Sequence, residues 1–184
     1  MSCATSLRHP KSRQAASMSN PQQPTFLVCP QDAHVAVRIL GKANYLNCGN
    51  FRDFIDRMLE QGHRRFVFDL EDCRGMDSTF LGILAGLAIE LRDKEPNGTL
   101  LLCNLSSNIS ELLSNLGLHT LLSIDSDLCR DCDAETEFTQ LNNQEIADAR
   151  KVLEAHENLV AANNENAAQF EDVISFLRNQ VNRD

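Results

Sequence analysis

Short apolar runs along the first two thirds of the chain predict β-strands. Val35, Val37 and Ile39 alternate with other residues, which is typical of a strand with one buried face. The stretches RRFVFDL and TLLLCNL are almost continuously apolar, as expected when both faces of a strand are covered. With two shorter runs, the pattern predicts strands over residues 26–29, 34–40, 64–70, 99–105 and 121–124.

Between these strands, apolar residues recur at spacings of three and four, which predicts helices. The three predicted helices cover about residues 48–61, 79–92 and 106–116. Residues suited to cap or end a helix flank each of them. These are Asn47 or Asn50 and Gly62 for the first helix, Asp77 for the second, and Ser106 or Ser107 and Gly117 for the third.

The predicted order of elements is β-β-α-β-α-β-α-β. After an initial hairpin, helices alternate with apolar strands, which predicts an α/β fold. We expect a small mixed sheet of about four to five strands with helices packed on it, and right-handed crossovers between parallel strands. This domain is predicted to span residues 25–125.

Two polar segments flank the predicted domain. Residues 1–24 are rich in Ser, Pro and Gln and lack apolar periodicity, so a disordered N-terminal arm is expected. A transit peptide and a true start at Met18 are the alternatives for this arm. Residues 126–142 are acidic and are predicted to form a linker.

The C-terminal segment, residues 143–182, has the apolar spacing of a coiled-coil seam. The sequence NNEN at 163–166 favours a turn and hence a helical hairpin, and one continuous coiled-coil helix is the alternative. We interpret His156 as a partly exposed seam residue and not as a ligand. The apolar face must be buried on the domain, in self-association or by a partner. The first half of the seam comprises Ile146, Ala149, Leu153, His156 and Val160.

Charge and hydropathy exclude some classes of ligand and location. The net charge of −9 argues against nucleic acid as the main ligand, because binding to phosphates needs a basic face. The longest apolar run, FLGILAGLAI, is too short to span a membrane and suits a buried helix. No signal-peptide pattern is recognisable, so a soluble, cytoplasmic protein is expected.

The nucleophilic and titratable residues form no familiar catalytic or metal-binding pattern. The five histidines are scattered, and no nucleotide-binding or zinc-protease motif is present. Among the seven cysteines, Cys129 and Cys132 form a lone CxxC without a second ligand pair, flanked by aspartates that oppose a lowered thiol pKa. A polar loop is the preferred interpretation, with half a zinc site or a redox pair as alternatives. The sequence therefore predicts no enzyme, no cofactor and no metal.

The stretch DSTFLGILAGL places two hydroxyl residues at the start of the most apolar helix. Capping accounts for Asp77, and the positive end of the helix dipole at Ser78 suits a phosphate or another anion. Gly82 and Gly86 lie one turn apart, and each glycine costs a helix roughly 1 kcal/mol relative to alanine. Some backbone is therefore expected to approach this stripe closely, either the sheet beneath the helix or a docked partner.

The sequence FVFDLEDCRGMDSTFLGILAGL resembles the signature of the STAS-domain family, the bacterial anti-sigma factor antagonists. In that family a hydrophobic–Asp–Leu strand leads to Asp-Ser-Ser/Thr-Gly-Leu-Gly at a helix start. The resemblance implies that Ser78 is phosphorylated by a partner kinase that is also the anti-sigma factor. The unphosphorylated form would bind that partner and free the sigma factor. Asp77, Leu81 and Gly82 fall on the neighbouring signature positions.

Two departures from the family pattern concern the partner surface. Phe80 stands where the family usually has glycine, which predicts a bulkier rim, and Asn44 stands near an acidic position, which predicts a less acidic site. Neither change removes the hydroxyl of Ser78, but both leave the identity of the partner open. The expected partner-binding residues are Asn44, Asp77, Ser78, Thr79, Phe80 and Gly82.

Two other functions remain as alternatives. A receiver-like domain would be phosphorylated on Asp69 or Asp72, but receivers need a lysine after a later strand, where this chain has Ser106 and Ser107. A binding or scaffolding module, such as an accessory subunit of a transporter or of a signalling assembly, would use the same fold without a phosphorylation switch. The C-terminal helices would then contribute self-association or partner contacts.

Overall fold

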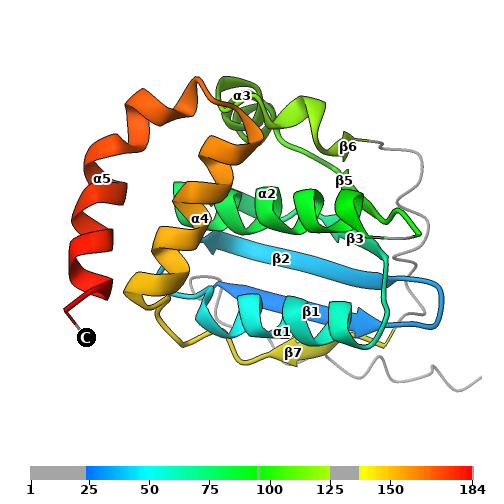
Figure 1. Cartoon of the computed structure of the whole chain (residues 1–184). Coiled ribbons are helices and arrows are strands. Elements are labelled where there is room, and N and C mark those ends of the chain that lie inside the picture. The colour runs from blue at the N-terminus through cyan, green and yellow to red at the C-terminus, as the bar shows by residue number, and fades with distance from the viewer. Residues whose placement is uncertain (1–23, 95, 125–136, 184) are drawn as a thin grey trace, which may run out of the picture.

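The computed structural model of the 184-residue chain describes residues 24–94, 96–124 and 137–183 (Figure 1). The predicted N-terminal arm up to residue 23, most of the predicted acidic linker, and Cys129 and Cys132 lie outside the described residues. Within them the chain forms a mixed sheet with helices packed on it, which confirms the predicted α/β class.

The sheet combines an antiparallel side and a parallel side. Its strand order is β6-β5-β3-β2-β1-β7, and β4 pairs with β2 outside this path. The strand β1 is antiparallel to β2 and β7, whereas the β2–β3, β2–β4, β3–β5 and β5–β6 pairs are parallel. The strands are β1 (Thr25–Pro30), β2 (Val35–Ala43), β3 (Arg65–Asp69), β4 (Cys73–Met76), β5 (Thr99–Cys103), β6 (Ser123–Ile124) and β7 (Thr139–Leu141).

The described sheet is larger than the predicted four to five strands because of β4 and β7. The sequence of β4, CRGM, lacks the apolar pattern of a strand, and this segment is held by parallel pairing with the end of β2. The segment Thr139–Leu141 was predicted to belong to an acidic linker. It pairs instead with the outer edge of β1, with Leu141 opposite Phe26. Backbone pairing with a neighbour, not side-chain periodicity, defines both strands.

Figure 1 shows α1 and α2 lying across one face of the sheet and α4 crossing over α2 on its outer side. The three predicted helices of the domain are present, and a 3₁₀ turn, η1 (Leu118–Thr120), follows the third. The helices are α1 (Gly49–Glu60), α2 (Ser78–Asp93), α3 (Ser107–Asn115), α4 (Ala149–Ala162) and α5 (Asn166–Val181).

Aromatic rings fix α1 and α2 to the sheet. Phe51 of α1 lies at the centre of the cluster, with its ring centroid 5.2 Å from that of Phe80 in α2. The Phe26 and Phe68 rings, from β1 and β3, lie 5.4 and 5.9 Å from Phe51 in edge-on orientation. All four rings are completely buried. Such pairs add to the free energy gained by burying the rings, so they set the position at which α2 begins.

Of the predicted caps at the starts of the three helices, two are confirmed and one is wrong. Asp77 caps α2, since its Oδ1 accepts a hydrogen bond of 2.9 Å from the Phe80 amide. Ser106 caps α3 in the same manner. The residue before α1 is Cys48, which makes no side-chain cap. Neither residue predicted as the cap has that role: Asn50 lies within α1, and Asn47 donates from Nδ2 to the carbonyl of Lys42 and closes the turn after β2.

The C-terminal segment consists of two helices, α4 and α5, interrupted at residues 163–165. We call the segment 149–181 the C-terminal hairpin. The buried Asn166 side chain donates to the carbonyl oxygens of Leu116 and Leu159, at 3.0 and 2.8 Å, and so ties the turn to the end of α3. The seam of this hairpin faces the domain: Ala155, His156, Leu159, Phe170, Ile174 and Leu177 are all buried.

Candidate functional site at the start of α2

Asp77 and Ser78 join the end of β4 to the start of α2. The Asp77 amide donates to the carbonyl of Ala43, at 3.1 Å, which anchors this turn to the end of β2. The Asp77 carboxylate accepts from the Phe80 amide through Oδ1 and from the Tyr45 amide through Oδ2, both at 2.9 Å. One carboxylate therefore caps α2 and fastens the loop between β2 and α1 beside it. Ser78 is left half-buried, with its hydroxyl free of the capping role.

The Ser78 hydroxyl contacts a histidine from the C-terminal hairpin. Its Oγ lies 3.0 Å from Nε2 of His156, and Nδ1 of the same ring lies 2.8 Å from the carbonyl oxygen of Val152. A carbonyl only accepts hydrogen bonds, so Nδ1 carries the proton. In the neutral ring, Nε2 is then an acceptor, and the Ser78 hydroxyl donates to it.

His156 is the residue of this site that the sequence interpretation missed. The seam pattern predicts a partly exposed residue, but His156 is buried, and its ring packs edge-on against Phe170 with the centroids 5.1 Å apart. The available signal was a polar residue in an otherwise apolar seam, because a buried polar side chain requires a partner. The sequence does not reveal that this partner is Ser78.

The glycine stripe of α2 is covered by α4. A Cβ on Gly82 would clash with the backbone carbonyl of Ala155, and a Cβ on Gly86 would clash with the Asn158 side chain. The sequence predicted that either the sheet or a partner would approach this stripe. The structure corrects both expectations, since the backbone that approaches belongs to another helix of the same chain.

Ion pairs hold α4 to α1 next to the glycine contact. Arg52 Nη2 lies 2.8 Å from Glu154 Oε1, and Lys151 Nζ lies 2.8 Å from Asp53 Oδ1. Partial burial acts to lower the pKa of Lys151, but the hydrogen bond and charge of Asp53 outweigh it, so this pKa is raised. Both acidic partners remain about half exposed, so these pairs are of the kind that salt screens.

Half of the expected partner-binding residues lie inside the molecule. The expectation of a bulkier rim at Phe80 is wrong, because that ring is completely buried against Phe51. Thr79 is also buried, and Gly82 lies under α4. Asp77, Ser78 and Asn44 keep partial exposure.

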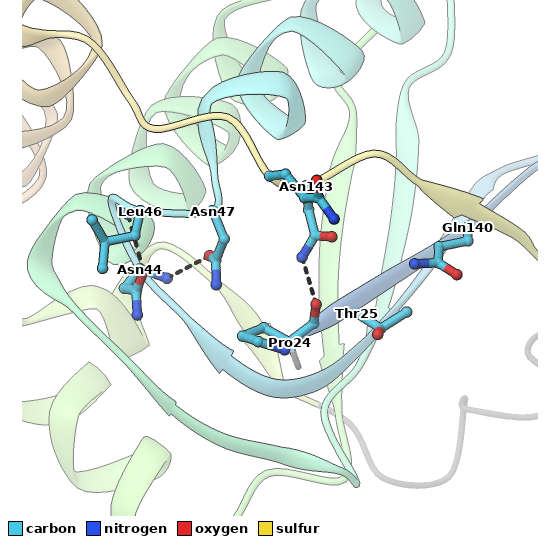
Figure 2. Close-up of a pocket in the computed structure, with 8 residues that line it drawn as sticks. Pro24, Thr25, Asn44, Leu46, Asn47, Gln140 and Asn143 are labelled. Carbon is cyan, nitrogen blue, oxygen red and sulfur yellow. Dashed lines mark hydrogen bonds between the residues drawn. The ribbon is translucent and has the colours of Figure 1, made fainter. Parts of the chain in front are cut away.

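Asn44 lies at one end of a polar pocket, which Figure 2 shows. The side-chain Oδ1 of Asn44 accepts a hydrogen bond of 3.0 Å from the backbone amide of Leu46. The backbone amide of Asn44 donates to Asn47 Oδ1 at 2.9 Å. Across the pocket, Asn143 Nδ2 donates to the carbonyl of Pro24 at 2.8 Å. The lining residues carry amides, one hydroxyl and apolar groups, but no titratable side chain: Pro24, Thr25, Asn44, Leu46, Asn47, Gln140, Asn143 and Gln144.

This pocket is separate from Ser78, which does not line it. Asn44 is connected to the start of α2 only indirectly, through the neighbouring Tyr45 amide that donates to Asp77. A pocket lined by amides, one hydroxyl and apolar groups, without a titratable side chain, offers polar contacts to a ligand.

Asp69, the carboxylate that a receiver-like domain would phosphorylate, is occupied. It is buried, its Oδ2 pairs with Arg38 Nε at 2.8 Å, and its Oδ1 accepts from Asn104 Nδ2 at 2.9 Å. Asp72 lies exposed in the turn before β4, and its carbonyl accepts from the Gly41 amide. This geometry gives Asp69 a structural role and speaks against the receiver alternative.

The described residues contain neither a metal-binding cluster nor a membrane-spanning helix. Within residues 24–94, 96–124 and 137–183, no three His, Cys, Asp or Glu side chains come together as a metal site would require. Over the same residues, no helix has both the length and the apolar character needed to cross a membrane.

Burial of Cys48, the residue before α1, predicts a loss of stability at alkaline pH. Burial, with a contribution from the Asp77 charge, raises the pKa of this thiol from 9.0 to about 12. Between these values the unfolded chain loses the thiol proton and the folded chain keeps it. The free energy of unfolding is therefore expected to fall as pH rises above 9, by up to about 1.4 kcal/mol per pH unit.

Urea unfolding at pH 8, 9 and 10 of the parent and of the variant Cys48→Ala measures this effect. The variant should lose less stability between pH 9 and 10 than the parent. It should retain a slope from Cys73, whose pKa is also raised by burial. Identical pH profiles for the two proteins would contradict the assignment to Cys48.

Comparison with known proteins assigns the class. Residues 27–129 match the STAS domain family, and the chain belongs to this family. The match ends before α4, so it leaves the C-terminal hairpin outside the family domain.

Several solved structures resemble this chain at low sequence identity. An anti-sigma factor antagonist from Mycobacterium paratuberculosis is 20% identical, with a TM-score of 0.50, over 58% of this chain and 89% of its own. The anti-sigma factor antagonist SpoIIAA in its unphosphorylated form is 18% identical, with a TM-score of 0.49, over 59% and 93%. The Bacillus cell fate determinant SpoIIAA in the phosphorylated form is 21% identical, with a TM-score of 0.46, over 56% and 92%. At 20% identity, the likeness to the Mycobacterium paratuberculosis structure concerns the fold alone.

Proposed function

We propose that this protein is an anti-sigma factor antagonist switched by phosphorylation of Ser78. In its unphosphorylated form it binds an anti-sigma factor that is also a serine kinase, and this binding releases the sigma factor. Phosphorylation of Ser78 ends the binding. The observation that carries the proposal is the Ser78 hydroxyl at the first residue of α2, half-buried and bonded to a side chain while Asp77 performs the capping.

The surroundings of Ser78 suit a partner surface. Tyr45 and Leu46 are large apolar residues that are 46% and 47% exposed, and the Tyr45 amide is bonded to Asp77. Exposed apolar residues grouped beside a polar site are typical of surfaces that bind proteins. A partner that contacts Tyr45 and Leu46 would therefore lie next to Ser78.

The physical effect of a phosphate differs between the fold and the interface. Phosphorylation adds about −1.5 to −2 charges at neutral pH. Within the domain, the N-terminus of α2 favours negative charge, so the effect on the stability of the helix is small. In an interface, the same charge must lose its water beside the Asp77 carboxylate, which costs several kcal/mol. Asp69 contributes little to this repulsion, because its charge is paired with Arg38.

Kinase assays on the full chain test this function. Candidate anti-sigma kinases are incubated with ATP and the protein, and the phosphosite is mapped by mass spectrometry. We expect an acid-stable phosphate on Ser78, its loss in Ser78→Ala, and its retention in the matched control Thr79→Val, whose hydroxyl is buried next to Ser78. The phosphorylated protein should bind the kinase at least tenfold more weakly than the unphosphorylated protein. A phosphate at another residue, or equal affinity of the two forms, would contradict the proposal.

A binding or scaffolding module is the second candidate, favoured by the hairpin. Phe176 on α5 is 59% exposed, which provides an apolar contact point away from Ser78. In that function the Ser78–His156 bond is purely structural. Partner binding would then be lost in Phe176→Ser and unchanged by phosphorylation, which is the opposite of the result expected for the switch.

A further inference from the structure

We propose that the C-terminal hairpin is an intramolecular cover that competes with the kinase partner for one face of α2. We call the side of α2 that carries Ser78, Gly82 and Gly86 the α2 face. In the closed state described here, α4 occupies this face, and in an open state the face is available to the partner. This inference rests on the proposed function and adds a regulation that the family domain, residues 27–129, does not contain.

The fit between α2 and α4 is that of a dedicated docking site. Gly82 and Gly86 allow backbone contact, and the covering residues Ala155 and Leu159 are 1% and 0% exposed. Glycine in the middle of a helix is unfavourable by itself, so the stripe benefits the protein only when another backbone lies on it. The described occupant is α4, and its position over α2 is visible in Figure 1.

The ion pairs that hold α4 against α1 can be broken at low cost. The pairs Arg52–Glu154 and Lys151–Asp53 have acidic partners that are 49% and 50% exposed, so water replaces them at low cost when α4 leaves. The apolar residues under α4 need a new cover in the open state, and a docked partner supplies it. Partner binding and opening of the hairpin are thus coupled.

The closed state and phosphorylated Ser78 exclude each other. Ser78 Oγ lies 3.0 Å from His156 Nε2, and Nε2 accepts a hydrogen bond from the hydroxyl. A phosphoryl group on Oγ removes the hydroxyl proton and needs space where the buried His156 ring lies. The kinase can therefore reach Ser78 only after α4 has moved, and the phosphate then prevents α4 from returning. The hairpin closes only over unphosphorylated Ser78.

The cover lowers partner affinity by a predictable factor. When only a fraction of the molecules is open, the apparent dissociation constant is the intrinsic constant divided by that fraction. Holding the hairpin closed should therefore abolish binding, and loosening it should strengthen binding.

A reversible disulfide tests this competition in the full-length chain. A Cβ at position 86 would lie 3.0 Å from Asn158 Cγ, the position that a cysteine sulfur would take, so Gly86→Cys combined with Asn158→Cys can form a disulfide. We expect the oxidised double variant to lose kinase binding and Ser78 phosphorylation by at least tenfold, and reduction to restore both. The single variants, treated with the same oxidant, are the controls.

The results of the disulfide experiment distinguish a failure of the cover from a failure of the proposed function. Equal phosphorylation of the oxidised and reduced forms would overturn the cover while leaving the proposed function intact. Failure of the two cysteines to pair, read from the peptide masses, would contradict the packing of α4 on Gly86. Absence of phosphorylation in every form would instead count against the proposed function.

A second experiment needs no kinase. Ser78→Cys is placed in the full chain, and its labelling by N-ethylmaleimide is followed by peptide mass spectrometry. Adding Gly82→Ala, which pushes against the Ala155 carbonyl, should raise the labelling rate at position 78 at least fivefold. Adding Gly75→Ala, whose Cβ would meet open space, is the matched control and should leave the rate unchanged. Equal rates in all three proteins, with circular dichroism confirming that they are folded, would overturn the cover.

Discussion

Replacing Phe80 with glycine, the residue usual at this position of the family signature, is expected to destabilise the domain by roughly 4–6 kcal/mol. Removal of a buried phenylalanine side chain costs about 3–5 kcal/mol, and glycine adds about 1 kcal/mol over alanine within a helix. The Phe80 ring is completely buried and lies 5.2 Å from the Phe51 ring and 5.7 Å from the Phe26 ring, measured between centroids. The loss of both contacts loosens α2 from α1 and β1.

Chemical denaturation of the parent and of Phe80→Gly measures this difference. The matched control is Phe176→Gly, the same substitution in a helix at a position that is 59% exposed, which should cost only about 1–2 kcal/mol. A conservative variant, Phe80→Leu, retains most of the apolar volume and should lose less than half of the Phe80→Gly effect. If Phe80→Gly were as stable as the parent, Phe80 would not be the core residue described here.

Removing the carboxylate in Asp69→Ala is expected to lower the free energy of unfolding by roughly 2–4 kcal/mol. Breaking a buried ion pair costs up to about 5 kcal/mol when its partner is left buried, and here the Arg38 side chain is 32% exposed and can gain water. Asp69 also accepts hydrogen bonds from Asn104 Nδ2 and the Glu71 amide, at 2.9 and 3.2 Å. The substitution therefore disturbs the ends of β2, β3 and β5 together.

The control for Asp69→Ala is Asp72→Ala, which removes an exposed carboxylate nearby and should change the stability by less than about 0.5 kcal/mol. Asp69→Asn keeps an acceptor oxygen without the charge and should fall between the two. Equal stability of Asp69→Ala and Asp72→Ala would mean that the buried pair is not structural, and it would reopen the receiver alternative.

Most helices and strands of the domain could be predicted from the sequence because they carry local signals. The alternating residues of β2, the nearly continuous apolar runs of β3 and β5, and the cap at Asp77 each depend on neighbours along the chain. The short strands β4 and β7 were missed for the complementary reason. Their pairing partners, β2 and β1, lie more than 30 and more than 110 residues away along the chain, and their own sequences carry no strand period.

In the candidate site, too, some features could be predicted from the sequence and others could not. Ser78 and the glycine stripe stand out in the sequence, because a surplus hydroxyl at a capped helix start and two glycines one turn apart both call for a function. The burial of Phe80 could not be predicted, since α2 is apolar on nearly every side and its period does not show which side meets the sheet. For the same reason the sequence did not show that Gly82 faces α4.

The sequence by itself determined the class of fold, the position of Ser78 at the start of α2, and the need for a close backbone contact at Gly82. Only the tertiary structure decided that this contact is made by α4 and that His156, 78 residues further along the chain, accepts a hydrogen bond from the Ser78 hydroxyl. The physical reason is that periodicity and capping are set by residues within a few positions of one another. The choice of the helix that covers an exposed stripe depends instead on how complete elements dock, and no local pattern encodes it.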